Sequence, residues 1–343
     1  MSLARLLHPD DVTGALARVL QAFTSASANT LGDLDVYRGL SLETLFPSPV
    51  QLPKARVETR WRLPGLVSED IVFPSLHEPI EPRFRERYRT AYGATHTVYA
   101  RRIRPAVARP RPRLLYLHGY MQPETYVEEL VLLVAMTQLL DMEIIQLQPP
   151  YHGRRTPSGS LYDGEFYWTA DVVRSIEALR QTLLDARTLL GWLLTEDARP
   201  VGISGISLGG ALAAALTCLD ARFAFSAPLV AHMDLAAMLA DAPVLETMRR
   251  ELRGFGWGID EFRRFVADIG WYELAPRLTA ERIHLFAASE DRFFLPDLVE
   301  EMRQRWGQPA IRWYPCSHMG FIARLPMVFR EIRRFVDGLP GLD

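Results

Sequence analysis

The sequence predicts an α/β protein with a mostly parallel central sheet flanked by helices. From residue 113 onward, short apolar runs alternate with stretches of helical periodicity. Apolar runs of this length are typical of strands that are buried on both faces of a parallel sheet. A glycine-rich turn also joins the apolar run at 201–203 to an alanine-rich helical stretch at 208–219. The chain of 343 residues is long enough to enclose a large core.

Composition limits the classes of function. The 39 basic and 41 acidic residues nearly balance, so no net field favours a nucleic-acid partner. Two cysteines, Cys218 and Cys316, are too few for a disulfide framework or a zinc site. The longest apolar run, 130–140, is shorter than the roughly 20 residues that a bilayer-spanning helix needs. The N-terminus lacks the continuous apolar stretch of a signal peptide. We therefore expect a cytoplasmic protein without a transmembrane segment.

The region before residue 113 is predicted to hold a helix and two strands. Apolar residues at helical spacing in 1–20 predict an amphipathic helix, and a polar loop follows around 25–35. Alternating patterns at 55–62 and 92–103 predict strands. Ten arginines stand between residues 82 and 113. We expect them on a solvated face and at strand edges, with a patch for an anionic partner as the alternative.

The region after residue 113 alternates strands and helices, with one long interruption. About fifty residues at 232–281 carry aromatic side chains and look helical. We interpret them as a helical cap insertion over the carboxyl edge of the sheet, where such sheets bind ligands. The predicted division is an N-terminal helical extension at 1–54, a core at 55–231 and 282–343, and this cap. Strands are expected near 114–117, 144–147, 201–203, 223–226, 283–287 and 311–314, and helices near 124–140, 165–195, 208–219, 297–306 and 326–337.

The strongest motif is Gly205-Ile206-Ser207-Leu208-Gly209. It has the G-x-S-x-G spacing of a nucleophile elbow, and it stands in the strand–turn–helix setting that this motif requires. A tight turn projects the serine hydroxyl, and the residues two positions to either side come close to the serine, so glycines there avoid a clash of side chains. We therefore predict Ser207 as a nucleophile. Ser204 is near but lacks the surrounding glycine pattern.

A serine nucleophile that attacks a carbonyl needs two N–H donors for the oxyanion. One comes from the residue after the serine, Leu208, and the other from the loop after an earlier strand. The strand near 114–117 ends in His118-Gly119-Tyr120-Met121. We expect the backbone of Tyr120 to be the second donor, with Met121 as the alternative, and His118 to order this loop.

The general base and its orienting acid should follow the serine in the order Ser, Asp or Glu, His. A predicted strand at 283–287 leads into Glu290-Asp291, and the last strand leads into His318. We predict Asp291 as the orienting acid and His318 as the base. Glu290 and Asp234 are the alternative acids.

Together these motifs resemble the α/β-hydrolase superfamily over about residues 113–337. A second group of residues is similar to the α/β-hydrolase domain-containing protein 18-like family. Its Pro-Tyr-Tyr-Gly-like turn with a following arginine corresponds to Pro150-Tyr151-His152-Gly153-Arg154, followed here by a long helix and by Gly205 to Gly210. The sequence departs from that family at its His-Gly turn and in the cap. We expect Arg154 and Arg155 to pair with loop carboxylates such as Asp163 or Glu165, with contact to an anionic part of a substrate as the alternative.

The motifs and the resemblance predict a serine hydrolase that cleaves a carboxylic ester through an acyl-enzyme intermediate, without metal or cofactor. A thioesterase or acyltransferase would use the same residues, and a non-catalytic binding protein on this scaffold is a further alternative. A serine peptidase would need a separate large domain for which the chain has little room. The expected partner is a small-molecule acyl ester or lipid-like substrate, and the oligomeric state stays open. Expected substrate contacts are His118, Met121, Tyr151, His152 and His232.

Overall fold

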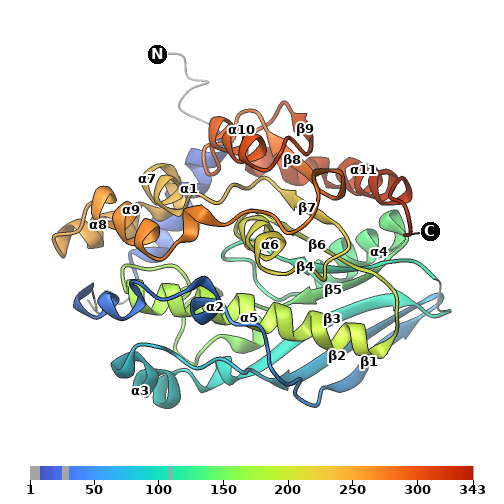
Figure 1. The fold of residues 1–343 in the computed structure, drawn as a ribbon, viewed down its shortest axis with the longest axis horizontal. Coiled ribbons are helices and arrows are strands. Elements are labelled where there is room, and N and C mark those ends of the chain that lie inside the picture. The colour runs from blue at the N-terminus through green and yellow to red at the C-terminus, as the bar shows by residue number, and fades with distance from the viewer. Residues whose placement is uncertain (1–7, 25–30, 108–109, 343) are drawn as a thin grey trace.

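The computed structural model describes residues 8–24, 31–107 and 110–342, and its strands form one nine-stranded sheet (Figure 1). Their order is β1-β2-β3-β5-β4-β6-β7-β8-β9. The strands from β5 to β9 in this order are parallel, whereas β1, β2 and β3 pair antiparallel with their neighbours. The mostly parallel sheet is therefore confirmed. The strands are β1 (Arg56–Leu63), β2 (Leu66–Pro74), β3 (Thr97–Pro105), β4 (Arg113–Leu117), β5 (Glu143–Leu147), β6 (Val201–Ile206), β7 (Ser226–Leu229), β8 (His284–Ala288) and β9 (Ala310–Tyr314).

Helices cover both faces of the parallel part of the sheet (Figure 1). Along β4, Leu115 and Leu117 belong to the core shared with α5 (Val172–Glu196) and α6 (Leu208–Leu219). Leu114 and Tyr116, which point the other way, belong to a second core with α4 (Val134–Leu140) and α11 (Leu325–Asp337). Because both faces of β4 are buried, its sequence does not alternate between apolar and polar residues.

The remaining helices lie before β1, between β2 and β3, and between the later strands. They are α1 (Pro9–Gln21), α2 (Leu42–Leu45), α3 (Pro82–Ala91), α7 (Leu235–Asp241), α8 (Glu246–Gly254), α9 (Ile259–Asp268) and α10 (Pro296–Arg305). The predicted loop around 25–35 lies partly outside the described residues, and 31–37 form a 3₁₀ helix. The predicted helix at 124–140 begins as a π-helical turn, Glu128–Leu133, that leads into α4. Of the described helices, none has the length and apolarity to cross a bilayer.

The sequence pattern does not predict the strand β2, because Ser68, Glu69 and Asp70 interrupt its apolar residues. All three side chains are buried. In the antiparallel register Glu69 stands opposite Arg102 and Asp70 opposite Arg101. The Arg102 Nε–Glu69 Oε2 distance is 2.8 Å, and the Arg101 Nε–Asp70 Oδ1 distance is 2.6 Å. These cross-strand pairs compensate the burial of charge.

This pairing corrects part of the expectation for the arginine-rich stretch, since Arg83 and Arg89 on α3 are exposed as expected. Arg101, Arg102 and Arg113 are buried in ion pairs and carbonyl contacts rather than exposed on a solvated face. Although burial disfavours its charge, the guanidinium groups of Arg104 and Arg102 hold the pKa of Glu69 below its usual value.

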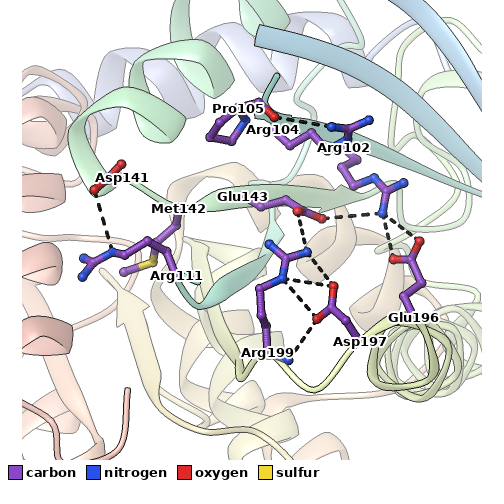
Figure 2. Close-up of a pocket in the computed structure, with 10 residues that line it drawn as sticks. All are labelled: Arg102, Arg104, Pro105, Arg111, Asp141, Met142, Glu143, Glu196, Asp197 and Arg199. Atoms are coloured by element: carbon purple, nitrogen blue, oxygen red, sulfur yellow. Dashed lines mark hydrogen bonds and ion pairs between the residues drawn. The ribbon is translucent and has the colours of Figure 1, made fainter. Parts of the chain in front are cut away.

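A polar pocket lies at the amino ends of β4 and β5, at the opposite edge of the sheet from the predicted site (Figure 2). Each arginine on its lining has an acidic partner. Arg199 lies 3.1 Å from Glu143 and 2.8 Å from Asp197, and Arg102 lies 2.8 Å from Glu196. The charges of the arginines in this pocket are therefore balanced by acidic side chains, and these ion pairs stabilise the amino edge of the sheet.

Candidate active site

Ser207 stands alone between the end of β6 and the start of α6, in a strained backbone conformation with φ 59° and ψ −121°. The turn has no room for side chains at its glycines. A Cβ on Gly205 would lie 2.2 Å from the Gly209 carbonyl oxygen, and one on Gly209 would lie 2.1 Å from that of Leu117. The glycines thus let the turn pack against itself and against the end of β4, rather than making room beside the serine side chain.

Replacing Gly209 with alanine is expected to destabilise the protein by at least about 3 kcal/mol, because the new methyl group meets backbone atoms that cannot rotate away. Gly254 at the end of α8 is the matched control, since a Cβ there meets nothing within 4 Å. Its change to alanine should alter stability by less than about 1 kcal/mol. Urea unfolding of both variants checks this, and equal unfolding midpoints would refute it.

The structure brings Ser207, His318 and Asp291 together at the carboxyl edge of the sheet. The Ser207 Oγ–His318 Nε2 distance is 2.9 Å, and the His318 Nδ1–Asp291 Oδ2 distance is 2.7 Å. Oδ1 of Asp291 accepts the N–H groups of Phe293 and Phe294 at 2.7 and 2.8 Å. Those bonds orient the carboxylate, and the carboxylate in turn favours the imidazole tautomer with its proton on Nδ1. Nε2 is then free to accept the serine proton.

The alternative residues are engaged elsewhere. The Ser204 hydroxyl is buried and donates to the Ala227 carbonyl at 2.6 Å. Asp234 caps α7 by accepting the N–H of Ala237 at 2.9 Å, and it also accepts the hydroxyl of Tyr272. Glu290 is exposed, whereas its neighbour Asp291 is buried beside the histidine. The geometry therefore favours Asp291 over both other acids.

The loop after β4 comes close to the serine. A Cβ on Gly119 would lie 3.6 Å from the Cβ of Ser207. The N–H of Gly119 donates to the Gln122 side chain at 3.3 Å, so it is already engaged. Tyr120 follows it in the loop. Leu208 is the first residue of α6, and an N–H at that position has no partner within the helix.

A cavity of about 630 Å³ opens above Ser207 and His318. Tyr120 and Met121 line it. The helix α1 also lines it, with Leu16 and Leu20, and nothing in the sequence pattern indicated this contribution. The other walls include Val131, Val244, Phe293, Met319 and Ile322.

The other expected substrate contacts are placed differently. The described side chains of His118, Tyr151, His152 and His232 are buried and do not line the cavity. Nδ1 of His118 lies 2.8 Å from the Gly119 carbonyl oxygen, in agreement with a role in ordering the loop. Burial lowers the pKa of His118, takes that of His152 well below its usual value and takes that of His232 to about 4. All three are therefore neutral at pH 7.

The two arginines of the turn after β5 have partners other than those expected. Arg154 lies 3.0 Å from Asp70, and Arg155 lies 2.8 Å from Asp185. Asp163 instead accepts the N–H of Gly153 at 3.0 Å. The prediction of carboxylate pairing was right in kind and wrong in its partners, because these acids come from β2 and α5 and are distant in sequence.

Within 8–24, 31–107 and 110–342, no three His, Cys, Asp or Glu side chains form a group that could hold a metal ion. Burial raises the pKa of the Cys316 thiol and raises that of Cys218 to about 12. Both cysteines are therefore protonated at neutral pH, which makes them poor nucleophiles.

Comparisons with known proteins agree with this architecture. Residues 124–243 match the family model described as alpha/beta hydrolase domain containing 18. An uncharacterized protein of Mycobacterium tuberculosis (strain ATCC 25618 / H37Rv) is 26% identical over 261 residues, which cover 72% of this chain and 57% of that protein. The chain thus spans little more than half the length of this relative.

Solved structures with a similar fold are known. An acetyl xylan esterase from Paenibacillus sp. R4 is 16% identical with a TM-score of 0.56, over 91% of this chain and 98% of that one. Acetyl xylan esterase 1 from Thermoanaerobacterium sp. JW/SL YS485 is 16% identical with a TM-score of 0.57, over 92% and 98% of the two chains. At this level of identity the likeness concerns the fold.

Proposed function

We propose a function for this chain on the basis of its fold and its site. It has the α/β-hydrolase fold and is similar to the alpha/beta hydrolase domain containing 18 family, as its motifs predicted. The chain is a serine hydrolase that cleaves a carboxylic ester. The observation that carries this proposal is the line of two short contacts from Asp291 through His318 to Ser207, which ends in a cavity.

The mechanism follows from the direction of these contacts. Nε2 of His318 removes the proton from Ser207 Oγ as the oxygen attacks the ester carbonyl. The N–H groups of Leu208 and Tyr120 stabilise the oxyanion, and each such donor contributes roughly 2.7–4 kcal/mol. The carboxylate of Asp291 stabilises the imidazolium, which then protonates the leaving alcohol. Water attacks the acyl-enzyme by the same proton transfers and releases the acid.

The cavity supports an acyl substrate with an apolar part. Its walls include Leu16, Leu20, Val131 and Ile322, while Ser207 and His318 supply polar atoms at its base. A pocket with mainly apolar walls and a few placed polar groups suits a small organic ligand. We favour an ester over an amide as the substrate, because the two acetyl xylan esterases named above share the fold.

We assign the segment 232–281 as a cap in this scheme. It holds α7 to α9, and Val244 between α7 and α8 lines the cavity together with Ser207. A cap at this place would select among substrates without taking part in bond cleavage. The two parts of the core, 55–231 and 282–343, supply Ser207 and the pair Asp291 and His318.

The test combines covalent labelling with a substrate series. A fluorophosphonate probe should attach to Ser207, as located by peptide mass spectrometry. A series of p-nitrophenyl esters from acetate to decanoate, with matched thioesters and an alcohol acceptor, separates esterase from thioesterase and acyltransferase. A protein that neither labels nor hydrolyses any member of the series would be a binding protein on this scaffold, and the proposal would be wrong.

A further inference from the structure

The second residue of α1 is an aspartate that contacts the loops of both Asp291 and His318. Asp10 is fully buried. Its Oδ2 accepts the N–H of His318 at 3.1 Å and the N–H of Arg292 at 3.1 Å, and its Oδ1 accepts the N–H of Met319 at 3.0 Å. One carboxylate therefore binds the backbone of His318, the predicted base, and the backbone of Arg292, which follows the predicted acid Asp291.

We propose that Asp10 is a positioning residue for ester hydrolysis, which holds the loop of Asp291 and the loop of His318 at the separation that catalysis needs. This inference rests on the proposed function of those two residues. The loops follow different strands, β8 and β9, and the N–H of Glu290 in one donates to the Cys316 carbonyl in the other at 3.0 Å. A shared acceptor from a third segment fixes their relative position, and a carboxylate makes stronger hydrogen bonds to N–H groups than a neutral acceptor does.

The rest of α1 is anchored so that Asp10 stays in place. Asp11 forms an ion pair with the side chain of Arg292, but both side chains are exposed, so this pair adds little to the anchoring. Gly14 packs against Pro243 so closely that a Cβ would lie 2.4 Å from the proline Cβ. Further along, the Gln21 amide donates to the Val244 carbonyl at 3.1 Å. The helix is thus held at one end by the catalytic loops and along its length by the segment 232–281.

The position of α1 links this anchoring to the substrate. The helix lies against α8 and against the 3₁₀ turn Pro243–Leu245, and both are far from it in the sequence. Leu16 and Leu20, on the same helix as Asp10, form part of the cavity wall. A shift of α1 would therefore move both the wall and the two loops, and a displacement of about 1 Å at reacting groups costs on the order of 10²-fold in rate.

The experiment compares Asp10→Asn with Asp11→Asn in the full chain, using the p-nitrophenyl ester that the wild type hydrolyses best. Asparagine keeps one acceptor oxygen but presents an amide N–H₂ to at least one of the three donors. We expect kcat to fall about 10- to 100-fold with KM changed less than about threefold. Asp11→Asn should change kcat by less than about twofold, since it loses only an exposed ion pair.

A second variant and a readout that does not need activity keep the test decisive. Gly14→Val should displace α1 through its clash with Pro243 and lower kcat without altering either catalytic loop directly. Amide hydrogen exchange at 291–294 and 317–320 should accelerate in Asp10→Asn and stay unchanged in Asp11→Asn. A wild type without ester hydrolysis would refute the proposed function, while exchange would still report on positioning. Asp10→Asn with wild-type kcat and wild-type exchange in both loops would refute the role of Asp10.

Discussion

Replacing Ser207 with alanine is expected to lower kcat for ester hydrolysis by about 10⁴- to 10⁶-fold, with little change in KM. The variant lacks the only hydroxyl that the structure places 2.9 Å from His318 Nε2 among the described residues. The oxyanion donors and the cavity would remain, so a small residual rate above that in water is expected. Steady-state kinetics on a p-nitrophenyl ester, together with loss of fluorophosphonate labelling, measures this effect.

Ser204→Ala is the matched control for this prediction. Ser204 lies three residues earlier on β6, and its hydroxyl donates to the Ala227 carbonyl. Its loss should reduce stability by about 1 kcal/mol and leave kcat within a factor of about three. The assignment of the nucleophile would be wrong if Ser207→Ala kept more than a tenth of the wild-type rate, or if Ser204→Ala produced the larger loss.

Replacing Asp291 with asparagine is expected to lower kcat by about 10⁴-fold at neutral pH. The asparagine oxygen can keep accepting the N–H groups of Phe293 and Phe294. The amide N–H₂ would then face Nδ1 of His318 and stabilise the tautomer whose proton is on Nε2. In that tautomer Nε2 has no lone pair to accept the serine proton. The arrangement of the three side chains is therefore kept, but His318 cannot deprotonate Ser207.

Asp234→Asn separates this effect from a general loss of an acidic side chain. Asp234 caps α7 and accepts the hydroxyl of Tyr272, so its change should cost about 1 kcal/mol of stability and leave kcat nearly unchanged. Thermal unfolding and kcat are measured on both variants. A larger loss of kcat in Asp234→Asn than in Asp291→Asn would show that the acid had been assigned to the wrong residue.

Local sequence patterns located the strands whose faces are both buried. β4, β5 and β8 begin within one residue of their predicted positions, because a strand without a solvent face is a continuous apolar run. β7 begins at Ser226 rather than at 223, since Phe223 and Phe225 are buried in the turn before it. Phe225 there packs on Gly202, whose added Cβ would lie 2.1 Å from the ring. A buried turn and a buried strand have the same apolar pattern.

The start of α5 shows a similar limit. The apolar and helical pattern begins near 165, but the helix begins at Val172 because the side chain of Asp171 accepts the N–H of Arg174. The residues before it, including Tyr167 and Trp168, are buried in the core without being helical. Helical periodicity reports which residues are apolar, whereas the cap decides where the helix begins.

The sequence by itself determined the fold class, the position of the elbow at Ser207 and the order of the residues proposed to work with it. Each depends on a short stretch of chain: an apolar run, a pair of glycines, or an acid or histidine directly after a strand. Only the tertiary structure decided the partners of β2's acids, the burial of His232 and the place of Asp10 beside His318. The contact between Asp10 and His318 joins residues that are 308 positions apart in the chain. A local sequence pattern cannot predict such a contact, because the two residues become neighbours only when the chain folds.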